Sequence, residues 1–125
     1  MEASEADAII NNQVAGSVAA LSIRASSSKT SKGNTKVALS GSSDEIKAIK
    51  GLGYTVKYKF YRSTKKSSNY VAKVEKKVKS YINTAGKKGT RYYYKARIMV
   101  YDADGNLVAK SELGQCKYAS RVWSK

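Results

Sequence analysis

The chain has 125 residues, with 24 lysines and arginines against nine acids and a formal net charge of +15 at pH 7. It contains no histidine and only one cysteine, Cys116, which excludes an internal disulfide, a cysteine metal site and any catalytic arrangement that relies on histidine as its base. A chain of this length buries a core as one domain without cross-links, and no apolar run approaches the roughly 18 residues of a membrane span.

The charge is unevenly distributed along the chain. Residues 1–20 hold three acids and no base, whereas residues 21–125 hold all 24 bases and six acids. A basic domain favours anionic partners, which include wall polymers, sulfated or uronic glycans, nucleic acid and lipid surfaces. The alternative is that the lysines serve solubility and protect sheet edges from pairing.

Two features bear on the compartment of the protein. Residues 1–5 are acidic where a signal peptide would be basic, so either the protein is cytosolic or a signal has been removed. Cys116 is expected to be a small buried hydrophobe, the alternative being a reactive thiol or a link between two chains.

A short helix is expected over residues 4–14. Ser4 and Asp7 have the spacing of a capping box, and the apolar residues that follow them fall at helical spacing. Such a short helix is not stable alone in water, so it either docks on the domain or stays disordered. From Gly16 onward the helical spacing gives way to an alternation of apolar and polar residues, which predicts a strand.

The next segments predict two strands and a short helix. Leu21, Ile23 and Ala25 share one face of a first strand, residues 26–34 are rich in turn formers, and residues 37–39 form a brief second strand. Residues 43–50 predict one or two helical turns with Ser43 as the N-cap.

Three further strands are expected before residue 84. Residues 54–62 alternate strictly between apolar and polar side chains, which is typical of a half-buried strand. After a polar turn over residues 63–69, short strands are expected over 70–74 and 78–83, and residues 85–89 form another turn.

Residues 90–101 give the strongest strand pattern in the chain. Tyr92, Tyr94, Ala96, Ile98 and Val100 share one face, while Tyr93, Lys95, Arg97, Met99 and Tyr101 share the other. Because successive side chains of a strand point to opposite faces, we expect the first set inside and the second outside.

The segment 102–106 predicts a hairpin turn. Asp and Gly adopt the positive φ angles that tight turns need, and a strand over 107–110 follows. The acids also resemble the start of a calcium loop, but Glu112 is one position too early for the ligand at position twelve and the flanks are strand-like, so we favour the hairpin. Residues 115–123 predict a final, interrupted strand.

About seven short strands with turns between them, and no repeated strand–helix–strand unit, predict two antiparallel sheets packed face to face. Residues 1–18 form a helical or disordered extension, and residues 19–125 form the sandwich.

Three segments carry a resemblance to a known family. Residues 53–58 (GYTVKY), 61–66 (YRSTKK) and 89–97 (GTRYYYKAR) resemble fibronectin type III domains, and most of all the Lys/Tyr-rich type of secreted and surface proteins of Gram-positive bacteria. The resemblance covers about residues 19–123. It implies a seven-stranded immunoglobulin-like sandwich in which Tyr92 is a buried corner residue. Family members usually carry a tryptophan in the second strand, where this chain has Leu39, and they often contain prolines, of which this chain has none.

The resemblance also implies a candidate ligand-binding face. If the third, sixth and last strands share one sheet, several bases and tyrosines project together from its outer side. Such a surface suits an anionic polymer, because the bases neutralise charge and tyrosine rings stack on sugars or bases. The alternative is a solvated face with its lysines splayed apart. The candidates are Lys57, Lys59, Tyr61, Tyr93, Lys95, Arg97 and Tyr101.

Two weaker candidates complete the set. Several family members contact ligands through the hairpin loop, which here contains Asp102, Asp104 and Asn106. A second basic cluster is expected mostly at solvated edges; it comprises Lys73, Lys76, Lys77 and Lys79, followed by Lys87, Lys88 and Arg91.

The expected function is that of a non-catalytic secreted or cell-surface module for binding, adhesion or spacing, with its signal peptide removed. No enzyme activity, cofactor or metal is expected, since the acids are few and no nucleophile–base arrangement can be drawn. The expected partner is an anionic polysaccharide, a wall polymer, or a host or bacterial surface protein. Non-specific nucleic-acid binding is the less favoured alternative, and dimerisation through Cys116 or a sheet edge is a third.

Overall fold

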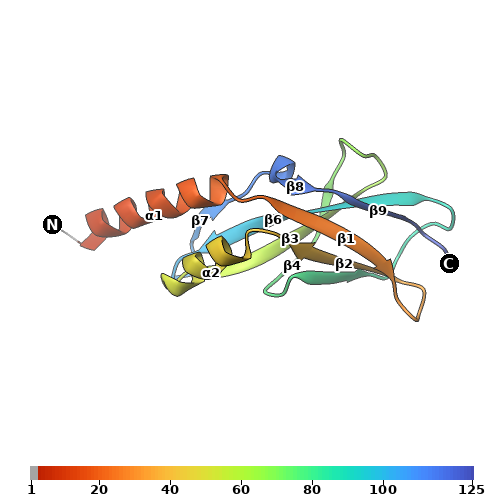
Figure 1. Ribbon diagram of the computed structural model, residues 1–125, viewed down its shortest axis with the longest axis horizontal. Helices are drawn as coiled ribbons and strands as arrows, with labels where there is room; N and C mark the ends of the chain where they lie inside the picture. The colour runs from red at the N-terminus through yellow and green to blue at the C-terminus, as the bar shows by residue number, and fades with distance from the viewer. Residues whose placement is uncertain (1–2) are drawn as a thin grey trace.

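The computed structural model describes residues 3–125 as two packed β-sheets with helices at one end. Figure 1 shows the first helix, α1 (Ala3–Ala19), extending from the sandwich at the end where α2 (Ser43–Gly51) also lies. The C-terminus lies at the opposite end. No helix among the described residues is long and apolar enough to cross a membrane.

The smaller sheet has four strands in the order β5-β2-β1-β8. These are β5 (Ser80–Asn83), β2 (Thr35–Ser40), β1 (Ile23–Lys29) and β8 (Cys116–Lys117). Neighbours are antiparallel except for β1 and β8, which are parallel.

The five-stranded sheet is built on two long central strands, β3 (Thr55–Ser63) and β6 (Arg91–Tyr101). The edge strand β4 (Val71–Lys76) pairs with β3. The other side of β6 pairs with β7 (Leu107–Lys110) at one end and with β9 (Ala119–Val122) at the other. The predicted β-sandwich is thereby confirmed, with the final strand divided into β7, β8 and β9.

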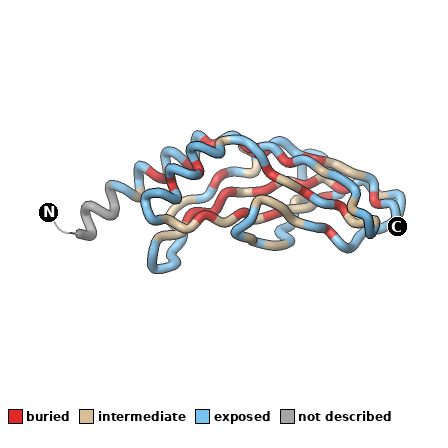
Figure 2. The backbone as a smooth tube through the Cα atoms, turned by 60° about the horizontal axis from the view of Figure 1, so that its bottom comes forward, coloured by how far each residue is buried: buried red, intermediate tan, exposed pale blue. Residues whose placement is uncertain are grey.

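The core lies between the two sheets and follows the alternation of β6. All five predicted inner residues of β6, from Tyr92 to Val100, are 6% exposed or less. In Figure 2 buried and half-buried positions alternate along the central strands. Each large apolar side chain buried here stabilises the fold by roughly 1.5–3 kcal/mol. Met99 was expected outside and is nonetheless 6% exposed, because it lies between Lys57 and Lys110 on the neighbouring strands.

Tyr92 is the buried corner residue that the family resemblance implied. Its hydroxyl accepts a hydrogen bond from the backbone N–H of Lys87 at 2.8 Å, which ties the start of β6 to the preceding loop. Trp123 packs at the same corner, and it approaches Gly86 so closely that a Cβ there would lie 2.6 Å from the indole ring. In the second strand, where family members usually carry a tryptophan, Leu39 occupies the buried position. The one tryptophan of this chain, Trp123, is instead buried at the Tyr92 corner.

The first helix is longer than the expected 4–14, and the alternation predicted from Gly16 was wrong for residues 16–19. Val14 and Val18 lie four residues apart and are fully buried, so this face of α1 docks on the sandwich. The side-chain amide of Gln115 then donates to the carbonyl oxygen of Val18, in the last turn of α1, and to that of Leu21, just beyond the helix.

Two local predictions also need correction. Residues 26–29 were assigned to a turn but belong to β1, because their backbone pairs with β2 whatever their side chains are; the turn occupies residues 30–34. Ser42, not Ser43, precedes α2, with a left-handed φ of 48°. Its hydroxyl bonds the backbone of Ser22 and does not cap the helix.

Candidate binding face

The register of β3 against β6 brings the predicted bases and tyrosines onto one face. Lys59 lies opposite Arg97, and Tyr61 lies opposite Lys95. Lys57, Tyr93 and Tyr101 belong to the same alternating sets, and all seven predicted residues are half-buried. We call this outer surface of the five-stranded sheet the basic face.

The structure adds residues that sequence reasoning missed. Lys110 pairs with Met99 and so shares its side of the sheet, and Arg91 continues the outer set of β6. The predicted hairpin after Tyr101 was a signal for Lys110, since a hairpin places the next strand beside β6. The bases of the face are therefore Lys57, Lys59, Arg91, Lys95, Arg97 and Lys110.

Cations of the face and its rim lie over tyrosine rings of the same molecule. Measured to the ring centroid, Lys57 Nζ is 5.1 Å from Tyr101, Arg97 Cζ is 5.5 Å from Tyr61, and Lys95 Nζ is 5.3 Å from Tyr70. Each such contact is favourable by roughly 0.5–1 kcal/mol at an exposed site. These contacts offset part of the repulsion between like charges on neighbouring strands.

Two loop tyrosines extend the aromatic surface beyond the strands. Tyr118, between β8 and β9, meets Tyr93 edge to face with 5.4 Å between the centroids, and Lys66 Nζ lies 5.7 Å from the Tyr118 ring. Tyr70 donates its hydroxyl hydrogen to the Lys66 carbonyl at 2.7 Å. Burial raises the pKa of Tyr70 to about 12, so its hydroxyl stays neutral at physiological pH. The predicted strands over 70–74 and 115–123 included Tyr70 and Tyr118, but the structure places both tyrosines outside the strands, Tyr70 just before β4 and Tyr118 between β8 and β9.

Two carboxylates partly neutralise the basic face. Glu75 lies opposite Lys59 and accepts a hydrogen bond from the Tyr101 hydroxyl at 2.6 Å; burial and this neighbour raise the pKa of Tyr101 to about 12. Glu112 Oε2 lies 3.7 Å from Arg97 Nη2, and the Glu112 side chain is 73% exposed, so this ion pair contributes little to stability. Six bases against two acids leave the face strongly positive.

Arg97 has unused hydrogen-bonding capacity. Its side chain is 20% exposed, and its Nε atom is buried without a hydrogen-bond partner among the described residues. Because Nε is buried, a polymer would meet only the terminal nitrogens of Arg97, whose paired N–H donors suit planar or tetrahedral oxyanions.

The hairpin loop uses its carboxylate within the turn. Asp102 Oδ1 accepts hydrogen bonds from the backbone N–H groups of Asp104 and Asn106, both at 2.9 Å, and these bonds lower the pKa of Asp102. Gly105 has a φ of 84°, as the turn requires. The segment is therefore the hairpin that we favoured over a calcium loop. Among the described residues, no cluster of three or more acids or cysteines is suited to a metal ion.

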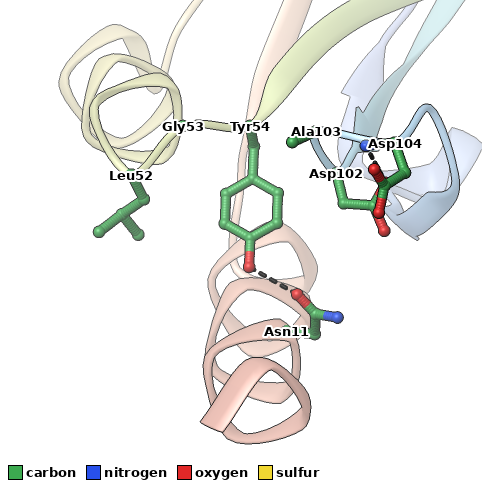
Figure 3. A pocket seen from close by; sticks show the side chains of 7 residues that line it. All are labelled: Asn11, Leu52, Gly53, Tyr54, Asp102, Ala103 and Asp104. Atoms are coloured by element: carbon green, nitrogen blue, oxygen red, sulfur yellow. Dashed lines mark hydrogen bonds between the residues drawn. The ribbon is translucent and has the colours of Figure 1, made fainter. Parts of the chain in front are cut away.

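Asp102 and Asp104 also line a pocket of about 200 Å³, shown in Figure 3. Its opposite walls come from α1 and from the segment between α2 and β3, where the Tyr54 hydroxyl donates to Asn11 Oδ1 at 2.6 Å. This contact ties α1 to the segment that leads into β3.

The second basic cluster is dispersed over several elements. Lys73 and Lys76 are on the edge strand β4, Lys77 and Lys79 follow it, Lys87 and Lys88 are in the loop before β6, and Arg91 belongs to the basic face. The structure therefore supplies no single surface that corresponds to this set.

Cys116 is 2% exposed, as expected for a small buried hydrophobe. Burial raises the pKa of its thiol, so the reactive thiolate form is disfavoured. A thiol in this position is not placed to link two chains.

Comparisons with known proteins bear on the fold. No protein-family model matches the sequence, and no curated protein matches it. A crystal structure of an Fn3-like protein from Clostridium thermocellum is similar, with a TM-score of 0.51 and 20% identity over 82% of this chain and 91% of that one.

Two larger proteins contain a similar unit. Domains A168–A170 of titin match with a TM-score of 0.52 and 14% identity over 83% of this chain, which spans 32% of that structure. The pectate lyase Pel3 from Pectobacterium carotovorum matches with a TM-score of 0.50 and 16% identity over 81% of this chain, which spans 26% of that one. These likenesses show that the chain has a fibronectin type III-like β-sandwich fold.

Proposed function

We propose that the protein is a non-catalytic binding or adhesion module, secreted by or displayed on a bacterial cell, which holds anionic polysaccharides on its basic face. The observation that carries this proposal is the set of six bases on one sheet face with only two carboxylates among them. The resemblance of residues 53–58, 61–66 and 89–97 to Lys/Tyr-rich surface domains supports the location.

The geometry favours a polyanion held by charge over one held by stacking. Lysine or arginine of the same molecule already lies over one side of Tyr61, Tyr70 and Tyr101. Proteins that bind single-stranded nucleic acid without sequence preference stack the bases on free faces of aromatic rings, so these tyrosine rings are poorly suited to that role. An acidic glycan or wall polymer needs only correctly spaced cations, which the β3–β6 register provides.

The test is a titration of the full chain with heparin and with teichoic acid at several salt concentrations. The variant carries Lys57→Gln with Lys95→Gln on the basic face. Its matched control, Lys36→Gln with Lys47→Gln, removes two exposed lysines from β2 and α2. We expect the face variant to lose about tenfold in affinity at low salt and the control to lose much less, because only the first pair faces the polymer.

Three results would overturn the proposal. Equal losses in both variants would show that only net charge matters. Tighter binding of a DNA oligonucleotide than of either glycan polymer, at the same salt, would favour the nucleic-acid alternative. Absence of binding at low salt would leave a spacer or a protein–protein module.

A further inference from the structure

A separate small pocket lies where β3 ends and β4 begins. It has a volume of about 210 Å³, and its lining includes Arg62, Thr64, Asn69, Lys73 and Tyr92. Arg62 belongs to the inner set of β3, which also contains the buried Tyr58 and Phe60. The pocket therefore opens beside the core at one end of the sandwich and is distinct from the basic face, which is on the outer side of the same sheet.

Arg62 is held rigidly in this pocket. Its Nη1 donates to the Ala85 carbonyl at 2.6 Å and to Asn83 Oδ1 at 3.2 Å, and its Cζ lies 4.4 Å from the centroid of the Tyr92 ring. Asn83 is itself 3% exposed and donates to the Tyr94 hydroxyl at 2.8 Å. Among the described residues, every hydrogen bond of Arg62 uses Nη1, so Nη2 and Nε remain available to a ligand.

Lys73 owes its position to an irregularity in the edge strand. Val74 pairs with Phe60 and Ala72 pairs with Tyr61, so Lys73 has no partner on β3 and forms a β-bulge. A bulge bends the strand and redirects the extra side chain. Lys73 thereby lines the same pocket as Arg62.

Hydrogen bonds of the Ser63 side chain hold the loop at the rim of the pocket. Ser63 is 4% exposed; its hydroxyl donates to the Ser68 carbonyl at 2.5 Å and accepts from the Lys65 N–H at 2.9 Å. These bonds fix the loop that carries Thr64 and Asn69. The pocket thus combines two cations with a hydroxyl and an amide on a fixed frame.

The charge and size of the pocket select its ligand. No acid lines it, and Glu75, the acid nearest to Lys73 in the sequence, is bonded to the Tyr101 hydroxyl on the basic face. Its volume is below the roughly 300–1,000 Å³ of pockets for whole drug-sized ligands. We propose that this pocket binds a single oxyanion group, a sulfate or a carboxylate. This site does not depend on the basic face, because the two share no residue.

The experiment is an amide NMR titration of the ¹⁵N-labelled full chain with sodium sulfate and, in a second arm, sodium glucuronate, both at constant ionic strength. We expect saturable shifts confined to Thr64, Asn69 and Lys73 and their neighbours, and the tighter arm identifies the group. Lys73→Gln should weaken binding roughly tenfold, because a charge-assisted hydrogen bond is lost. Lys77→Gln, an exposed neighbour, is the matched control and should change little.

Arg62→Lys supplies a second test, since it keeps the charge and loses the fork of donors; weaker binding with the shifts still local is the expected result. Lys57→Gln with Lys95→Gln should leave this site unchanged, which separates its fate from that of the basic face. Shifts spread over the whole surface, no saturation with either anion, or equal effects of Lys73→Gln and Lys77→Gln would each overturn the proposal.

Discussion

Two buried tyrosines allow a sharp test of how polar groups are satisfied in the core. Tyr58 and Tyr94 are each 1% exposed and lie on the inner sides of adjacent strands. The Tyr94 hydroxyl accepts a hydrogen bond from Asn83 at 2.8 Å, whereas the Tyr58 hydroxyl is buried without a partner among the described residues. Replacing each tyrosine by phenylalanine removes the same single atom from two very different surroundings.

The two substitutions should change the free energy of unfolding differently: Tyr94→Phe should lower it, and Tyr58→Phe should leave it unchanged or raise it. Tyr94→Phe leaves the buried Asn83 amide without its acceptor, which costs about 1–3 kcal/mol. Tyr58→Phe removes a hydroxyl that loses its hydration on folding and gains no hydrogen bond, so the free energy of unfolding should stay unchanged or rise by up to about 1 kcal/mol. A loss of about 2 kcal/mol lowers the melting temperature of a domain of this size by roughly 6–10 °C.

Urea unfolding followed by the fluorescence of Trp123, which is 3% exposed in the folded state, measures both variants. The midpoint should fall for Tyr94→Phe and hold or rise for Tyr58→Phe, with equal slopes. Equal destabilisation by the two substitutions would refute the reasoning, because it would mean that the Tyr58 hydroxyl has a partner that the structure does not show.

Two more predictions follow from burial and close packing. Burial raises the pKa of Tyr58, Tyr81, Tyr94 and the Cys116 thiol. Because the folded state then holds protons that the unfolded state releases, the free energy of unfolding should be constant near neutral pH and fall once pH passes about 9–10. A urea midpoint that does not fall by pH 11 would contradict this. Gly86→Ala should lower the free energy of unfolding by about 1–3 kcal/mol, because its Cβ would lie 2.6 Å from Trp123. Gly16→Ala, in an open position of α1, should raise it by about 0.5–1 kcal/mol. The order of the two melting temperatures checks this, and the reverse order would show that the Trp123 contact is not tight.

The sequence predicted β6 and β3 well because both strands alternate without interruption. An unbroken period of two determines which residues are inside, and the neighbours of Tyr92 and Val100 add nothing that contradicts it. Met99 was placed outside for the same reason. Its burial depends on lysines of two other strands, Lys57 and Lys110, whose register no local pattern contains.

The errors at the N-terminal side have a common physical cause. The helix α1 continues past Gly16 because Val18 docks on the sandwich and because Gln115, 97 residues away from Val18 in the sequence, bonds its carbonyl. Residues 26–29 read as a turn by composition, yet backbone pairing with β2 makes them a strand. In both places tertiary contacts override the local preference.

The candidate face was predictable in part. Alternation and the implied strand order predicted that Lys59 and Arg97 project from the same outer face, and the register then places them opposite each other. The pairing of cations with rings was not predictable, because it depends on rotamers and on the loop tyrosines Tyr70 and Tyr118. The pocket of Arg62 and Lys73 depends on a bulge in β4, which a single sequence does not reveal.

The most direct test of the central claim is an amide NMR map of the full chain during titration with a short heparin oligosaccharide. The account predicts that the largest shifts fall on outward-facing residues of β3 and β6, around Lys59 and Arg97, and that they diminish as salt is added. Shifts centred on the four-stranded sheet, for example on Lys36 in β2, or no shifts at low salt, would contradict the assignment of the basic face as the binding surface.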